Sequence, residues 1–106
     1  MGDTAYADWT QVTTYTSGET WDIGSLYTKV GKITFLRIQV ESLTANTLET
    51  LFTLPAGYRP PYPIEFDGFG GNSYFNHAHF KIGANGVVSV YSADTYASGF
   101  ISFPSY

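Results

Sequence analysis

Alternation of apolar and polar residues with a period of two dominates this chain, and such a pattern predicts β-strands. The longest alternating run is residues 32–43, in which Leu36, Ile38 and Val40 are separated by mostly polar positions. We expect the apolar set to face a core. Phe35 lies among the polar set, which predicts an outer surface that is covered or shared. No segment of useful length has the period of a helix.

Shorter apolar blocks bounded by Gly, Pro, Asn or Ser predict further strands. They are residues 9–15, 25–30, 50–54, 64–67, 74–82, 87–91 and 99–103, with 21–23 as a short strand or a loop. Four prolines in PAGYRPPYP (55–63) exclude a central strand there and predict an extended corner between two sheets. Eight or nine short strands predict an all-β fold, an antiparallel β-sandwich or barrel of jelly-roll type.

The clearest hairpin signal is HAHFKIGANGVVSVY, residues 77–91. The sequence GANG fits a type I turn that closes into a bulge, with Gly86 in the left-handed conformation. This register pairs Phe80 with Val90 on an apolar face. It also predicts Ile82 opposite Val88.

The opposite face of this hairpin then carries both histidines of the chain, His77 and His79. The same register makes His79 a cross-strand neighbour of Tyr91, and Lys81 a neighbour of Ser89. A ring beside a tyrosine can hold a sugar, because aromatic faces pack on C–H groups while ring nitrogens and an ammonium group bind hydroxyls. The alternative is a pair of ordinary solvated histidines.

Two histidines spaced by one residue on a strand point the same way, as some metal sites require. The sequence offers no third histidine, no cysteine and no carboxylate close by along the chain. We therefore predict no metal site and no cofactor.

Glu65 and Asp67 also share a strand face, and paired carboxylates can hydrolyse glycosidic bonds. Nothing in the sequence marks a raised pKa or a deep cleft for them. No G-x-S-x-G motif is present. We therefore expect a protein that is not an enzyme, with a glycan hydrolase as a minor alternative.

The composition narrows the possible partners. Charged residues make up only 13% of the chain, the net charge is −4, and the basic residues are scattered, so we expect no nucleic-acid partner. No apolar run approaches the roughly 20 residues of a membrane span, so no membrane insertion is expected. Tyrosine, threonine, serine and glycine are abundant, as is typical of strands and of polar-aromatic recognition surfaces.

The length of 106 residues fits one domain. Residues 1–8 contain neither the basic nor the apolar part of a signal peptide. We expect residues 1–106 to form a single domain, in which residues 1–8 are a cloning remnant or the end of a preceding neck.

Four segments resemble motifs of C-terminal domains in tailed-phage tail-fibre and baseplate proteins. They are WTQVTTYTSGETW, YTKVGKITFLRIQV, TLFTLPAGYRPPYP and IGANGVVSVY. They follow one another in the family's order and reach to about residue 92. The chain is most similar to the receptor-binding head domains of phages that infect lactococci and related Gram-positive bacteria.

This resemblance implies a compact β-barrel head that forms a homotrimer at the baseplate or tail tip of a virion. It implies attachment to a saccharide of the host cell wall, outside the host cell, and contact with other tail proteins through an N-terminal part that is missing here. In some relatives a histidine and an aromatic residue at the positions of His79 and Tyr91 line the saccharide site. Lys81 stands where an acidic residue can occur in the family. No arginine follows in the 92–99 loop, where Asp94 and Tyr96 are the available substitutes.

Two functions from different classes follow. The first is a saccharide-binding receptor head without catalysis, with a site at His77, His79, Lys81, Tyr91, Asp94 and Tyr96. The second is a structural trimerisation or tip module without a ligand of its own, in which the surface aromatics form a subunit interface.

Overall fold

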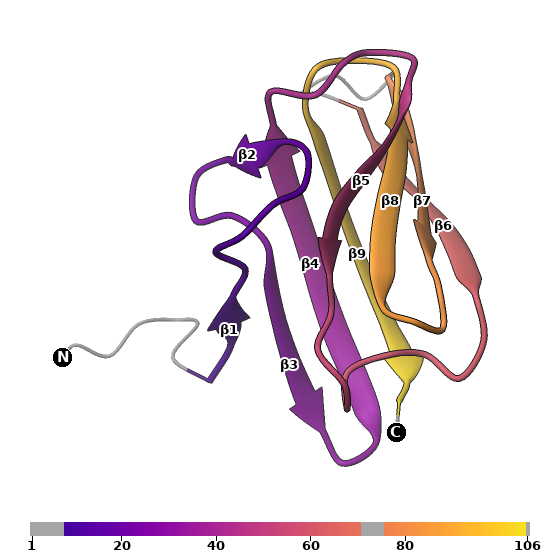
Figure 1. Ribbon diagram of the computed structural model, residues 1–106. Helices are drawn as coiled ribbons and strands as arrows, with labels where there is room; N and C mark the ends of the chain where they lie inside the picture. Colours follow the sequence, from indigo (N-terminus) through magenta and orange to yellow (C-terminus); the bar gives the residue numbers. More distant parts are fainter. Residues whose placement is uncertain (1–7, 71–75, 106) are drawn as a thin grey trace, which may run out of the picture.

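The structure is a computed structural model that describes residues 8–70 and 76–105 (Figure 1). These residues form nine strands and no helix. The strands are β1 (Thr10–Gln11), β2 (Glu19–Thr20), β3 (Leu26–Val30), β4 (Ile33–Glu41), β5 (Leu48–Thr53), β6 (Ile64–Phe69), β7 (His77–Ile82), β8 (Val87–Ser92) and β9 (Ala97–Pro104). In the described part of the chain, no helix is long and apolar enough to cross a membrane.

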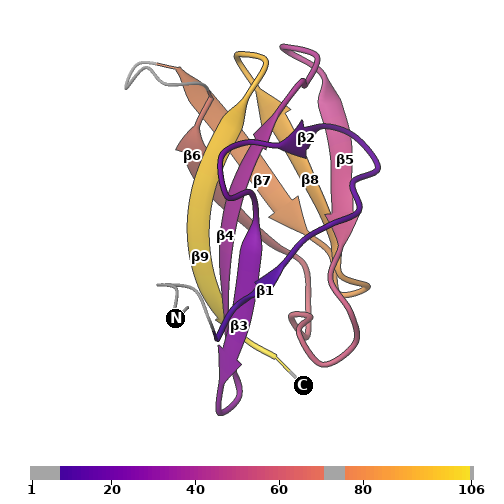
Figure 2. The ribbon, with the colours of Figure 1, turned by 90° about the vertical axis from the view of Figure 1, so that its left-hand side faces the viewer.

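All strand pairs are antiparallel, and the main path of the sheet runs β1-β3-β4-β9-β6-β7-β8-β5, with β2 paired to β4 off this path. The sheet curls so that β3, β4 and β9 face β5, β7 and β8 across the core (Figures 1 and 2). The two halves are joined where Phe69 of β6 pairs with Ser98 of β9. The predicted all-β antiparallel sandwich or barrel is confirmed.

The strongest predicted strand, β4, runs through the middle of one half and pairs with β3 on one side and β9 on the other. Leu36, Ile38 and Val40 are fully buried, and the residues between them lie on the outer face, as their alternation predicted. Phe35 lies on that outer face beside Phe100 of β9, with ring centroids 6.5 Å apart.

The buried side chains of both halves form one core. At the joint between the halves, the ring of Phe80 stacks on Phe66 with centroids 5.0 Å apart. Gly68 and Gly99 lie beside Phe80 with no side chain of their own, because a Cβ on either would come within 2.7 Å of Cε2 of Phe80. The two glycines thus make room for the largest fully buried side chain at the joint.

Several predicted strands have different limits. The run 9–15 forms a strand only at Thr10–Gln11. Residues 21–23 form a loop, because the backbone N–H of Gly24 donates a hydrogen bond of 2.9 Å to Trp21 O and Asp22 adopts the left-handed conformation. β2 lies outside all the predicted strands. The first two residues of the predicted strand 74–82 lie outside the described residues. The proline-rich corner 55–63 contains no strand, as predicted.

Strand β5 forms one edge of the sheet and is irregular. Its pairing with β8 shifts register between Thr50 and Phe52, so Leu51 is an extra residue in β5. The carbonyl of Leu51 accepts a hydrogen bond of 2.6 Å from Thr16 N, outside any strand. A loop residue therefore covers part of this edge.

The glycine at position 68 gives a test of the joint. A Cβ on Gly68 would lie 2.3 Å from the carbonyl oxygen of Ser98, a backbone atom that cannot turn away. We expect Gly68→Ala to lower the free energy of unfolding by about 1–3 kcal/mol, the typical cost of overpacking. Urea denaturation measures it. Ser102→Ala, on the exposed side of β9, is the control and should change little. Equal stability of the two variants would contradict this packing.

Candidate functional site

The β7–β8 hairpin has the register that the sequence predicted. His79 lies opposite Tyr91 and Lys81 opposite Ser89. Gly86 has a φ of 88°, in the left-handed region. The predicted outer face of this hairpin therefore exists, with His79 and Tyr91 side by side on it.

Strand β6 adds two carboxylates to this face. Its antiparallel pairing with β7 sets Asp67 opposite His79. Nδ1 of His79 lies 2.8 Å from Oδ1 of Asp67, and Nε2 of His79 lies 2.5 Å from Oε1 of Glu65. Nε2 of His77 lies 3.2 Å from the same Oδ1 of Asp67. We call Glu65, Asp67, His77 and His79 the histidine-carboxylate cluster.

No carboxylate lies close to the two histidines along the chain, but in space Glu65 and Asp67 contact them. Asp67 precedes His77 by ten positions in the sequence, but the antiparallel pairing of β6 with β7 brings the two side chains together. A carboxylate is therefore available beside the two histidines as a third possible metal ligand. The ligand atoms of Asp67, His77 and His79 all lie within 4.8 Å of one another.

The cluster lies at the surface, and its members shift each other's protonation. The side chain of His79 is 44% exposed. Hydrogen bonds to Glu65 and then Asp67 raise the pKa of His79 above its ordinary 6.5. The hydrogen bond from His79 lowers the pKa of Glu65 and of Asp67. The two carboxylates thus favour the imidazolium form of His79 more than water favours it for a free histidine.

A second feature lies on the same outer face, where β4, β9 and β6 adjoin. It is a solvent-open depression with a volume of about 470 Å³. The lining residues are Trp21, Arg37, Ile38, Gln39, Asp67, Gly68, Phe69, Ser98, Gly99 and Phe100. Phe100 is 58% and Phe69 48% exposed. Sequence reasoning missed this site.

Polar groups of β4 lie in the same depression. Nη1 of Arg37 donates a hydrogen bond of 2.9 Å to Gly24 O, in the loop that carries Trp21. Oε1 of Gln39 is buried and has no hydrogen-bond partner within residues 8–70 and 76–105. A buried acceptor without a partner is costly, and a donor from a bound molecule would remove that cost.

The structure separates the six predicted site residues. His77, His79, Lys81 and Tyr91 lie together on the hairpin face. Asp94 instead accepts hydrogen bonds from its own loop and from Asn76 Nδ2.

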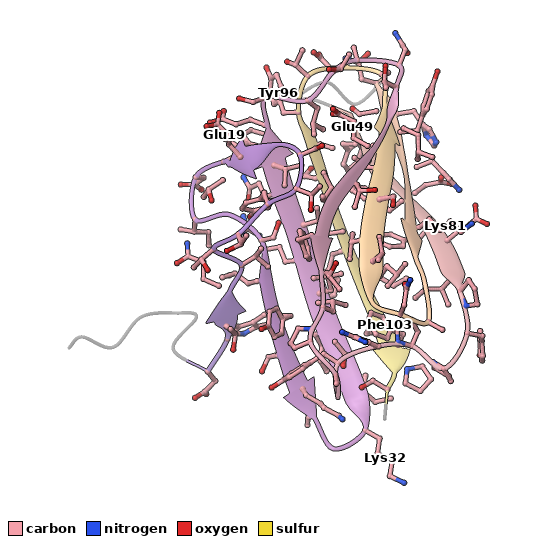
Figure 3. All side chains as sticks on the ribbon, viewed as in Figure 1. Glu19, Lys32, Glu49, Lys81, Tyr96 and Phe103 are labelled. Atoms are coloured by element: carbon pink, nitrogen blue, oxygen red, sulfur yellow. The ribbon has the colours of Figure 1, made fainter. Side chains whose placement is uncertain are left out.

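Tyr96 packs its ring against Trp21, with centroids 4.9 Å apart, at the border of the depression. Figure 3 shows Tyr96 and Lys81 well apart, with Lys81 on the outer side of β7. Tyr96 therefore belongs with the depression instead of the hairpin, because the loop after β8 turns toward the other half of the sheet.

The variant His79→Gln tests the hydrogen bonds of the cluster through pH. Because the pKa of His79 is raised in the folded protein, its contribution to stability is fully present below the ordinary 6.5 and is lost as pH rises through the raised value. The lowered pKa of Glu65 gives a contribution that is present above the ordinary 4.5 and is lost as pH falls through the lowered value.

We therefore expect the melting temperature of the wild type to exceed that of His79→Gln. This margin should be largest between pH 4.5 and 6.5 and smaller above neutral pH. The margin should be at most a few degrees, since exposed pairs contribute little. Thermal melts followed by circular dichroism measure it. A margin that stays constant from about pH 5 to about pH 9 would contradict this description of the cluster.

Neither the models of known protein families nor the curated proteins include a match to this chain.

Proposed function

We propose that this chain is a saccharide-binding domain without catalytic activity, and that its binding site is the depression formed by β4, β9 and β6. The observation that carries this proposal is the composition of the depression. Exposed aromatic rings and polar side chains line one open space of about 470 Å³. Small-molecule sites typically have volumes of about 300–1,000 Å³.

The aromatic residues supply the apolar part of such a site. Phe69 and Phe100 are each about half exposed, and Trp21 stands at the border. Sugar rings present C–H groups on one face, and an aromatic ring packs well against them. Leaving two phenylalanines exposed is otherwise unfavourable, because each keeps apolar area in water.

The polar residues supply hydrogen bonds to hydroxyl groups. Arg37 carries five N–H donors, of which the structure uses one on Gly24. Asp67 is an acceptor while ionised, and its lowered pKa keeps it ionised at neutral pH. Oε1 of Gln39 has no partner among the described residues, and after a rotation of the amide toward the depression it could accept a hydrogen bond from a sugar hydroxyl.

The state of the two strand-face carboxylates supports a function without catalysis. A glycoside hydrolase needs one carboxyl group that stays protonated near neutral pH, which requires a raised pKa. Glu65 and Asp67 both have lowered pKa values, because both accept hydrogen bonds from His79. Neither carboxyl group is therefore suited to act as the general acid.

The resemblance to phage receptor-binding heads gives this proposal its biological setting. In that setting the domain is the head of a homotrimer at the tail tip or baseplate of a virion. It binds a saccharide of the host cell wall from outside the cell. Single saccharide sites are generally weak, and three heads on one trimer would raise the effective affinity through avidity.

A second candidate function is a trimerisation or tip module, and the exposed apolar side chains favour it. Leu48 is 68% exposed and adjoins Tyr91 across the β5–β8 pair. Phe35 and Phe100 lie together on the outer face of β4 and β9. Such residues would serve equally as a contact between copies of the chain.

Binding to cells tests the first function. We expect the fluorescently labelled chain to sediment with intact Gram-positive cells of some strains and with their purified wall polysaccharide. Phe100→Ala should weaken binding by about tenfold, since it removes a stacking ring. Tyr62→Ala is the matched control, because Tyr62 is an aromatic residue exposed on the proline-rich corner, away from the depression.

Two outcomes would overturn this assignment. Loss of binding in His79→Ala and Tyr91→Ala, with Phe100→Ala unchanged, would place the saccharide on the hairpin instead. Failure of the wild type to bind any tested strain or polysaccharide would contradict saccharide binding altogether.

Sedimentation of the protein in buffer tests the second function. If Phe100 lies in a subunit interface, the wild type should sediment as a trimer and Phe100→Asp as a monomer, because burying a charge at an interface is costly. Analytical ultracentrifugation distinguishes the two. A monomeric wild type would contradict the trimerisation module.

A further inference from the structure

We propose that Asp67, His77 and His79 form a binding site for a divalent transition-metal ion, zinc in the first instance, on the outer face of β6 and β7. The site requires only residues of the histidine-carboxylate cluster. It does not rest on the proposed saccharide function.

Strand geometry brings the three ligands together. His77 and His79 are two residues apart on β7, so their rings leave the same face of the sheet. Asp67 pairs directly with His79 from the neighbouring strand. All three are therefore fixed by regular backbone pairing and not by a loop, which favours a preorganised site.

The distances suit a small ion. Oδ1 of Asp67 lies 2.8 Å from Nδ1 of His79 and 3.2 Å from Nε2 of His77. In a tetrahedral zinc site with bonds of about 2.0–2.1 Å, neighbouring ligand atoms lie about 3.3–3.5 Å apart. The two oxygen–nitrogen distances would have to lengthen by a few tenths of an ångström. The ligand atoms of all three residues lie within 4.8 Å of one another, so the two histidine rings, which are exposed, would adjust to bring their nitrogens to the same ion.

Glu65 supplies a feature that a chance group of surface residues lacks. Histidines that bind metals usually donate their other ring N–H to a carboxylate, which fixes the tautomer and the ring orientation. Nε2 of His79 lies 2.5 Å from Oε1 of Glu65, while Nδ1 lies 2.8 Å from Oδ1 of Asp67. Glu65 is thus a positioning residue that leaves Nδ1 as the metal-binding atom.

The ligand set indicates which ions the site prefers. Two imidazole nitrogens and one carboxylate suit zinc and its neighbours in the first transition series, whereas magnesium and calcium prefer oxygen alone. Asp67 and Glu65 together balance the charge of a divalent ion. Lys81 of β7 pairs with Glu65 of β6, so its ammonium group is the positive charge next to the site along the two strands. Three protein ligands leave a fourth position for water or an oxygen of another molecule.

Calorimetric titration of the untagged chain with zinc chloride tests the proposal. We expect one zinc ion per chain with a dissociation constant in the micromolar range, and no heat from magnesium chloride. His77→Gln, His79→Gln and Asp67→Asn should each weaken binding at least tenfold. Glu65→Gln should weaken it about 10–100-fold, as loss of a ligand's carboxylate partner typically does. The matched control is Glu19→Gln, because Glu19 is an acidic residue on β2, away from the cluster. This variant should bind zinc like the wild type.

Nitrogen NMR of the histidine rings gives a second readout, and assignment is simple because the chain has two histidines. Zinc should shift Nδ1 of His79 and Nε2 of His77, and circular dichroism of each variant checks that it remains folded. No saturable heat with millimolar zinc would overturn the proposal. So would zinc binding that His77→Gln leaves unchanged, or zinc-bound ring nitrogens other than these two.

Discussion

The packing of the Phe80 ring against two glycines determines how the two halves of the sheet meet. Gly68 and Gly99 come from strands far apart in the sequence, and each lies so close to the ring that a side chain would collide with it. Their approach allows Phe69 and Ser98 to pair, which is the hydrogen-bonded link between β6 and β9. The outer face depends on this link, because it sets Asp67 and Phe69 beside Phe100 and so creates the depression.

The parts that the sequence predicted correctly are those set by local pattern. The register of the β7–β8 hairpin follows from its turn and from alternation, so the neighbours His79 and Tyr91 could be predicted. The carboxylate partners of His79 could not, because they require the pairing of β6 with β7 across a separate loop. The depression is formed by residues of three strands that are distant in the sequence. The sequence indicates only one part of it, the polar face of residues 32–43 with Phe35 on that face. Alternation along the strand predicts correctly that Glu65 and Asp67 share a face. It does not predict which strand pairs with theirs, because that pairing depends on residues distant in the sequence.

Asp67 belongs both to the histidine-carboxylate cluster and to the depression. A carboxylate that binds a metal through one oxygen still offers the other to a hydroxyl group. The two proposed ligands would therefore share one side chain, and each would change the affinity for the other by the same factor. Whether the ion raises or lowers the affinity for the sugar depends on geometry. An ion that fixes Asp67 in the position the sugar requires raises the affinity, whereas an ion that binds both carboxylate oxygens leaves none for the sugar and lowers it.

The irregular edge strand β5 has a consequence for the protein at high concentration. A regular, unpaired strand edge offers its amide and carbonyl groups to any identical chain, and sheets can then join into polymers. Here the extra residue Leu51 bends β5, and its carbonyl is already occupied by Thr16 N. A neighbouring molecule therefore meets no continuous row of free backbone groups along β5, which disfavours the growth of fibrils from this edge of the sheet.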